Sequence, residues 1–173
     1  MANDNIETVV LPGISRAYGV EILLRKSQGR NKYWIAYTLS KSEQKTAGRT
    51  TNENGINSSQ WYNTPYDKTH DFSINSEYTI NKKLKIVGNF IFQTGQPTNY
   101  PNSQYNYMNL NVPNYGVRNS QRLPNYHRLD INLTLTPKNR ARKIESSWIF
   151  GVYNLYDRDC LLYTSDAADE SVC

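Results

Sequence analysis

The sequence predicts an all-β protein built as an antiparallel meander of about six long strands. The main observation is that apolar and polar residues alternate in six separate stretches, a pattern typical of strands with one apolar and one polar face. Composition agrees, because 14 tyrosines and many asparagines, with few alanines and leucines, favour strands and polar loops over helices. The connections between the stretches alternate between short polar turns and long polar loops.

Each predicted strand has one apolar face. The strands are expected at residues 18–26, 33–42, 71–80, 84–93, 126–137 and 144–153. They run 9 to 12 residues, which exceeds the about 5–6 residues usual in soluble sheets and is close to what a tilted strand needs to cross a bilayer. The apolar positions, in chain order, are Val20, Ile22 and Leu24; Tyr33, Ile35, Tyr37 and Leu39; Phe72, Ile74, Tyr78 and Ile80; Leu84, Ile86, Phe90 and Phe92; Leu129, Ile131, Leu133 and Leu135; and Ile144, Trp148, Phe150 and Val152.

The connections indicate a membrane barrel. Short turns are expected at residues 27–31, 81–83 and 138–142, and long polar loops at about 43–68 and 96–125. Outer-membrane barrels have short turns at one end and long loops at the other. Because a closed barrel needs at least about 8 strands, six strands are either completed by oligomerisation or belong to a larger barrel. The opening "MANDNIETVVLPG" shows no signal peptide, which favours a piece of a larger barrel, and no apolar run is long enough for a transmembrane helix.

Several stretches together resemble one family. They are "YGVEILLRK", "YTLSKSE", "YDKTHDFSINSEY", "FQTGQP", "RNSQRLPNYHRLDINL" and "SSWIFGVYNLYDRD". In order and spacing they resemble the C-terminal barrel strands of TonB-dependent outer-membrane receptors of the Bacteroidetes type, over about residues 5–159. The resemblance implies that the sheet is part of a transmembrane barrel of about 22 strands that is incomplete, and open, in isolation.

The resemblance also implies a function and a set of partners. Such receptors import a scarce ligand, namely an iron chelate, a vitamin or an oligosaccharide, across the bacterial outer membrane. The implied partners are outer-membrane lipid, the remainder of the barrel and its plug domain, and the TonB protein through an N-terminal region. This chain has no recognisable plug or TonB-contacting segment, so we expect that it cannot transport a ligand alone.

Two groups of residues are candidates for a functional role. The long loops are rich in Tyr, Trp and Asn, whose rings stack on sugars or chelates and whose amides both donate and accept hydrogen bonds. The loop residues expected to contact a small-molecule or oligosaccharide ligand are Trp61, Tyr62, Tyr100, Tyr105 and Tyr107. In the fifth strand, Arg128, Asp130 and Asn132 alternate with the apolar residues and are expected to face the barrel lumen.

The sequence offers little support for catalysis. His70 lies near Asp67 and Asp71, and His127 lies near Arg128 and Asp130, as a base and an orienting carboxylate would. Strand alternation, however, puts His127 and Asp130 on opposite faces. We find no metal motif, no phosphate-binding glycine loop and no basic run typical of nucleic-acid binding. The protein is therefore expected not to be an enzyme and to need no cofactor or metal.

The last residues differ in character from the rest. Residues 1–159 form the expected partial barrel, whereas "CLLYTSDAADE", residues 160–170, reads like the translation of a sequencing-library adapter. We therefore interpret residues 160–173 as a non-native tail, although a natural loop with a short seventh strand is the alternative. Without this tail the net charge rises from +5 to +8, because three acidic residues are lost. Both cysteines, and the disulfide they suggest, are lost with it.

A soluble protein could explain the same pattern. In this alternative the chain is an all-β carbohydrate-binding module that uses the same aromatic loops, and its apolar face packs on a second sheet instead of lipid.

Overall fold

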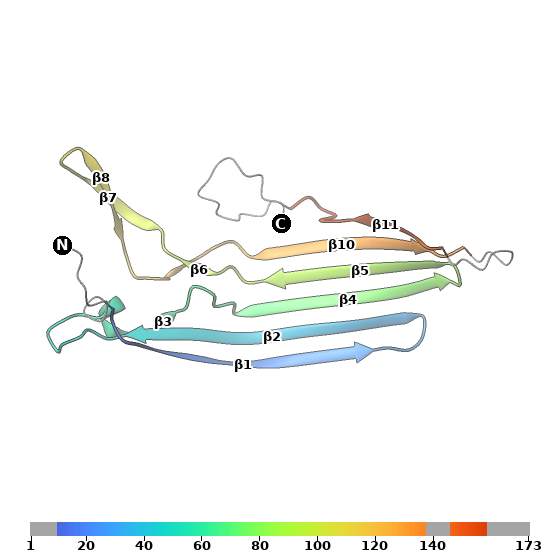
Figure 1. Cartoon of the computed structure of the whole chain (residues 1–173), viewed down its shortest axis with the longest axis horizontal. Coiled ribbons are helices and arrows are strands. Elements are labelled where there is room, and N and C mark those ends of the chain that lie inside the picture. The colour runs from blue at the N-terminus through green and yellow to red at the C-terminus, as the bar shows by residue number, and fades with distance from the viewer. Residues whose placement is uncertain (1–9, 138–145, 159–173) are drawn as a thin grey trace. The chain divides into compact units, whose positions relative to one another are not determined.

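The computed structural model describes residues 10–137 and 146–158, and it is all-β. Most described residues lie in antiparallel strands (Figure 1). The elements are β1 (Gly13–Lys26), β2 (Asn31–Thr46), the short 3₁₀ segment η2 (Ile56–Ser59), β3 (Tyr62–Asn63), β4 (His70–Asn81), β5 (Leu84–Gln93), β6 (Pro97–Thr98), β7 (Pro101–Tyr107), β8 (Leu110–Tyr115), β9 (Gln121–Arg122), β10 (Tyr126–Leu135) and β11 (Trp148–Val152).

The principal sheet is an open antiparallel meander. Its order is β1-β2-β4-β5-β10-β11, and the short β3 pairs with β2. Two small ladders, β6-β9 and β7-β8, lie outside this path. The predicted all-β class and the predicted antiparallel meander are thus confirmed.

The chain divides into two compact units. Among the described residues, unit 1 comprises residues 10–19, 40–68 and 95–123. Unit 2 comprises residues 20–39, 69–94, 124–137 and 146–158. Unit 1 therefore contains most of the two long connections, and unit 2 contains most of the sheet.

The strand register of unit 2 gathers the alternating apolar residues on one face. One cross-strand row runs Leu129–Phe90–Ile74–Ile35, because each residue lies directly opposite the next. The next row along this face has His127, Phe92, Phe72 and Tyr37. Residues that lie directly opposite each other in a sheet share a face, so these rows form one continuous apolar surface.

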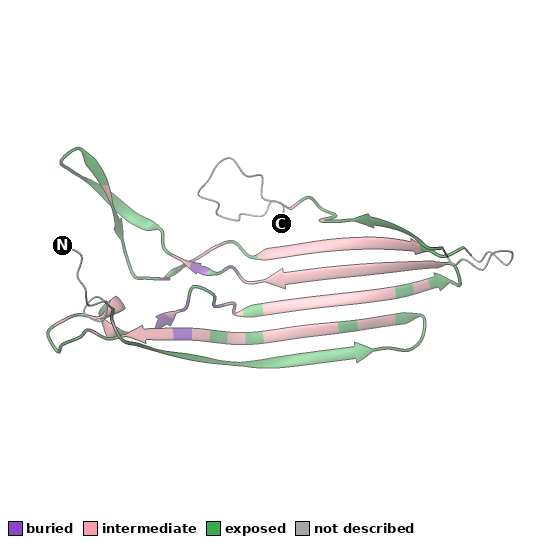
Figure 2. Cartoon of the chain, in the orientation of Figure 1, coloured by how far each residue is buried: buried purple, intermediate pink, exposed green. Residues whose placement is uncertain are grey.

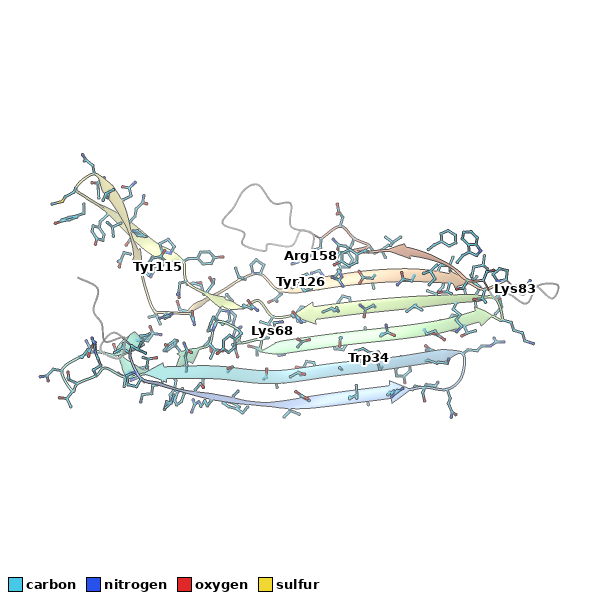
Figure 3. All side chains as sticks on the ribbon, viewed as in Figure 1. Trp34, Lys68, Lys83, Tyr115, Tyr126 and Arg158 are labelled. Atoms are coloured by element: carbon cyan, nitrogen blue, oxygen red, sulfur yellow. The ribbon has the colours of Figure 1, made fainter. Side chains whose placement is uncertain are left out.

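The other face of unit 2 is mostly polar, although Trp34, Val87 and Ile91 also lie on it. Asp130 lies opposite Asn89, and Asn89 lies opposite Asn75. Arg128 and Asp130 form an ion pair at 3.0 Å on this face. Nearby on the same face, Glu77 accepts a hydrogen bond from Lys32, at 3.3 Å, and forms an ion pair with Lys85. Figure 3 shows Trp34 on β2 and Tyr126 at the start of β10. Trp34 lies directly opposite Asn75 of β4.

Unit 2 has no buried core. Every one of its described residues is half-buried or exposed, as the pink and green strands of Figure 2 show. Val20, Ile22 and Leu24 on β1 are all more than half exposed. In an ordinary soluble domain, residues of this kind are the ones most often buried.

The long connections are more ordered than the sequence indicates. The expected loop at 43–68 begins with the end of β2 and contains β3, and the expected loop at 96–125 contains both small ladders. The tip of the β7-β8 hairpin is Met108–Asn109, with φ of 51° and 62°, flanked by the paired residues Tyr107 and Leu110. This is a two-residue type I′ turn, which is usually formed by Asn-Gly, so the pair Met-Asn gave no turn signal.

Strand ends differ from the prediction in other places. The first strand begins at Gly13 instead of residue 18, and the last is described only from Trp148 to Val152. The expected turn at 138–142, residues 144–145 of the expected sixth strand, and the tail at 160–173 lie outside the described residues.

Candidate functional site

Unit 1 is held together by a buried ion pair. The Asp67 side chain is fully buried and pairs with the Arg122 guanidinium. Asp67 Oδ1 also accepts a hydrogen bond from the Ser42 backbone N–H at 2.6 Å. Arg122 donates further to the backbone oxygens of Gly95, at 2.9 Å, and Asp67, at 3.3 Å. Because a buried charge is stable only when it is paired, this contact fixes the 40–68 segment against the 95–123 segment.

Threonine and asparagine side chains extend this network. Thr64 is buried, its N–H donates to Ser42 O at 3.0 Å, and its hydroxyl donates to Ser42 Oγ at 3.0 Å. The buried Asn119 donates from Nδ2 to Asn63 O at 2.6 Å, and its N–H donates to Asn99 Oδ1 at 2.5 Å. The two segments are thus joined by side-chain contacts with the backbone as well as by the ion pair.

A reciprocal pair of hydrogen bonds fixes the backbone of Arg118. Asn57 Oδ1 accepts from the Arg118 N–H at 2.8 Å, and Asn57 Nδ2 donates to the Arg118 carbonyl at 3.1 Å. Asn57 has a φ of 51°, a left-handed conformation that asparagine tolerates better than most residues. The Arg118 side chain remains outside this pairing.

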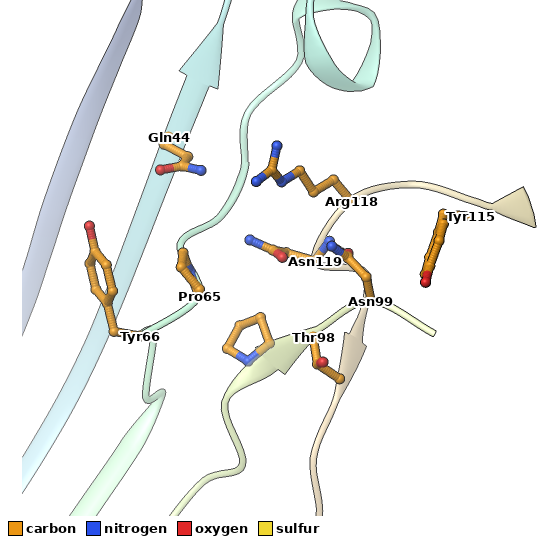
Figure 4. Close-up of a pocket in the computed structure, with 9 residues that line it drawn as sticks. Gln44, Pro65, Tyr66, Thr98, Asn99, Tyr115, Arg118 and Asn119 are labelled. Atoms are coloured by element: carbon orange, nitrogen blue, oxygen red, sulfur yellow. The ribbon is translucent and has the colours of Figure 1, made fainter. Parts of the chain in front are cut away.

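Arg118 lines a cavity of about 550 Å³, which we call the Arg118 pocket (Figure 4). Its lining residues are Gln44, Pro65, Tyr66, Pro97, Thr98, Asn99, Tyr115, Arg118 and Asn119. Figure 4 shows the Tyr66 ring at one end, the Tyr115 ring at the other, and the Arg118 guanidinium directed into the space between them. Both rings are more than half exposed, so their faces are accessible to a ligand.

A second cavity, of about 510 Å³, shares Arg118 and Asn119 with the first. Trp61 and Tyr62 line it. The Arg16 guanidinium lies 4.1 Å from the Trp61 ring centroid, a cation–π distance, and forms a 2.7 Å ion pair with Glu43. Lys41 pairs with the other oxygen of Glu43 at 2.7 Å.

The structure brings together two of the five predicted ligand residues. Trp61 and Tyr62 line the second cavity, but Tyr62 is 6% exposed and its hydroxyl is hydrogen-bonded to Thr46 Oγ1 at 3.0 Å. Tyr62 therefore offers a ligand little surface. Tyr100, Tyr105 and Tyr107 are exposed on or beside β7 and line neither of the two cavities.

Sequence reasoning missed most of the Arg118 pocket. It did not find Tyr66, Tyr115 or Arg118, and it considered Asp67 only as a neighbour of His70. The available signal was charge, because residues 54–66, which precede Asp67, are all neutral, and residues 95–123 contain arginines but no acid.

The charges of unit 1 leave an excess of positive groups. Its described residues include seven basic and three acidic side chains. Each acid is in an ion pair, Glu43 with Arg16 and Lys41, Glu53 with Arg49, and Asp67 with Arg122. The Arg118 guanidinium has no ion pair within the described part of the chain.

Each histidine ring is hydrogen-bonded to a tyrosine hydroxyl. His70 Nδ1 and the Tyr37 hydroxyl are 2.9 Å apart, and His127 Nδ1 and the Tyr156 hydroxyl are 2.7 Å apart. Within residues 10–137 and 146–158, no group of three or more His, Cys, Asp or Glu residues is arranged to hold a metal ion. Over the same ranges, no helix has the length and apolar character needed to cross a membrane.

The fold defines the class of this chain as an open antiparallel β-sheet with two cavities in its long connections. Comparisons with family models, curated proteins and solved structures give no match to this chain.

Proposed function

We propose that this chain is part of a TonB-dependent outer-membrane receptor, which imports an iron chelate, a vitamin or an oligosaccharide. The observation that carries the proposal is the apolar face of unit 2, which spans several long strands without a buried residue. Exposed apolar surface on this scale is unfavourable in water by about 25 cal/mol per Å². Lipid would remove that cost while leaving the polar face toward an aqueous lumen.

Strand length supports the proposal. β10 has 10 residues and pairs along its whole length with β5. At about 3.3 Å per residue and a tilt of about 45°, such a strand rises about 23 Å, close to the apolar band of about 25 Å in outer-membrane barrels. In this proposal the spanning segments are the strand portions of unit 2, and unit 1 lies outside the membrane.

The sheet edges support a larger barrel. The principal sheet ends at β1 on one side and β11 on the other. Unpaired N–H and C=O groups at such edges are too costly in lipid, so the remaining strands of the barrel would pair with them. Arg128, Asp130 and Asn132 would then face the lumen and the plug domain. Transport would also need the plug and its contact with TonB, which other parts of the receptor would supply.

Fractionation of cells that express the intact gene product tests this proposal. We expect the protein in the outer-membrane fraction, resistant to alkaline carbonate and released only by detergent. Recovery in the soluble fraction without detergent would refute the receptor and favour the soluble carbohydrate-binding module. The two outcomes differ because lipid covers the apolar face in the first case and protein covers it in the second.

A further inference from the structure

The residues of the Arg118 pocket indicate the chemistry of the ligand that would bind there. This inference rests on the proposed function, because it takes the pocket as the ligand site of the receptor. Arg118 is well placed to bind an anion. Its backbone is fixed by Asn57 on both sides, at 2.8 and 3.1 Å, and its guanidinium enters the pocket (Figure 4). A guanidinium presents planar donors that match the two oxygens of a carboxylate.

The surrounding charges favour an anion over a cation. All three acids in the described part of unit 1 are already paired with arginine or lysine, so a bare metal ion or a cationic ligand would find no available carboxylate there. The surplus positive charge raises the local concentration of anions instead.

The rest of the pocket suits a ligand with hydroxyl groups and a flat apolar face. Asn99 Oδ1 accepts a hydrogen bond from the Asn119 N–H at 2.5 Å, which orients the Asn99 side chain in the pocket wall. Thr98 and Gln44 also line the pocket. Amides and hydroxyls both donate to and accept from hydroxyl groups. The rings of Tyr66 and Tyr115, 68% and 56% exposed, can stack on apolar ring faces.

We propose that the Arg118 pocket binds a carboxylated, polyhydroxylated ligand, with the carboxylate on Arg118 and the body of the ligand between Tyr66 and Tyr115. Two sources share this chemistry, an acidic sugar and a hydroxycarboxylate chelate of iron. The pocket volume of about 550 Å³ lies within the range of small-molecule sites.

Calorimetric titration of the intact gene product, purified in detergent micelles, tests the proposal. The probes are a galacturonic acid trisaccharide, the neutral sugar maltotriose, and ferric citrate. We expect at least one carboxylated probe to bind about 10-fold or more tightly than maltotriose, because a charged hydrogen bond is worth more than a neutral one. Comparison of the two carboxylated probes distinguishes sugar from chelate.

The variants Arg118→Gln and Arg118→Lys distinguish binding by the Arg118 guanidinium from nonspecific attraction by the net positive charge of unit 1. Arg118→Gln is expected to lower the affinity for the carboxylated probe about 10- to 100-fold and to change the affinity for maltotriose less than about 2-fold. Arg118→Lys is expected to lower the affinity for the carboxylated probe by an intermediate factor. The matched control is Arg49→Gln, which removes the same charge from an exposed pair in unit 1 and is expected to change affinity less than about 2-fold.

A second pair tests the stacking. Tyr66→Ala is expected to weaken binding of the carboxylated probe about 10-fold, whereas Tyr18→Ala, at an exposed tyrosine of unit 1 that does not line the pocket, is expected to leave the affinity unchanged.

Three results would overturn the inference. They are equal binding of charged and neutral probes, equal effects of Arg118→Gln and Arg49→Gln, and no binding to a chain whose circular dichroism shows the folded sheet. If the protein fractionates with the outer membrane but shows any of these, only the ligand inference fails. If Arg118-dependent binding occurs in a protein that is soluble without detergent, only the proposed function fails.

Discussion

Replacing Asp67 with asparagine should destabilise unit 1 strongly. The Asp67 side chain is 0% exposed, and that of its partner Arg122 is 30% exposed. Removing one member of a buried pair costs about 3–5 kcal/mol, because the other charge remains without compensation. Asp67→Asn keeps an acceptor for the Ser42 N–H, and Arg122 is partly hydrated, so we expect a cost at the lower end, about 3 kcal/mol.

Guanidinium unfolding of the detergent-refolded chain measures this cost. For a guanidinium dependence of about 2–6 kcal/mol per M, a loss of 3 kcal/mol lowers the midpoint by about 0.5–1.5 M. Hydrogen exchange at the Ser42 amide reports the same opening locally, because that N–H bonds to Asp67 Oδ1.

The control for Asp67→Asn is Glu53→Gln, which breaks the exposed Arg49–Glu53 pair and is expected to leave the midpoint nearly unchanged, because exposed ion pairs contribute little to stability. The double variant Asp67→Asn/Arg122→Gln should cost less than the sum of the two single variants, since neither charge is then left alone. If Asp67→Asn shifts the midpoint no more than Glu53→Gln, the buried pair does not hold unit 1 together.

Three further predictions follow from other parts of the structure. Ile74→Arg, on the apolar face, should lower the free energy of unfolding in lipid by about 2–4 kcal/mol, whereas Ser73→Arg, on the other face, should lower it little. Unfolding in bilayers measures both variants, and equal losses would contradict the assigned faces. Met108→Asn should stabilise the β7-β8 hairpin by about 0.5–1 kcal/mol, since φ is positive there; slower hydrogen exchange across the hairpin would show it, and faster exchange would count against the turn type. The Glu53 carboxyl should titrate below its ordinary pKa of 4.5, because Arg49 donates hydrogen bonds to the charged form. Its stabilisation is therefore present above pH 4.5 and is lost as the pH falls through the lowered pKa. A carbon NMR titration of Arg49→Gln should show the midpoint rising toward the ordinary value, because the side-chain hydrogen bonds are lost while the one from the residue 49 N–H stays, and an unchanged midpoint would remove the Arg49 side chain as the cause.

The sheet could be predicted from the sequence where one face is apolar. In β4 and β10, residues such as Ile74 and Leu129 alternate with polar neighbours, so the period of two identifies both the strand and its faces. The β7-β8 hairpin was not found this way, because its apolar face is short, with Tyr105 and Tyr107 opposite Val112 and Leu110, and its turn lacks glycine.

The candidate site was less predictable than the sheet. Trp61 was found by composition, because aromatic residues in polar loops are typical of binding surfaces. Asp67 and Arg122 are 55 positions apart, and neither has a local pattern that indicates the other. Contacts of this kind depend on which loops the sheet order brings together, and that information is absent from any short window of sequence.

Because the two long connections contact each other, neither can be exchanged without the other. A chimera that replaces residues 95–123 alone would remove Arg122 and leave the buried Asp67 carboxylate without a cation. It would also leave Asn57 without its two hydrogen bonds to the Arg118 backbone unless the new segment follows the same path. Transferring the Arg118 pocket to another β-sheet protein therefore requires both segments to be grafted together, with each insertion point placed at the end of a sheet strand.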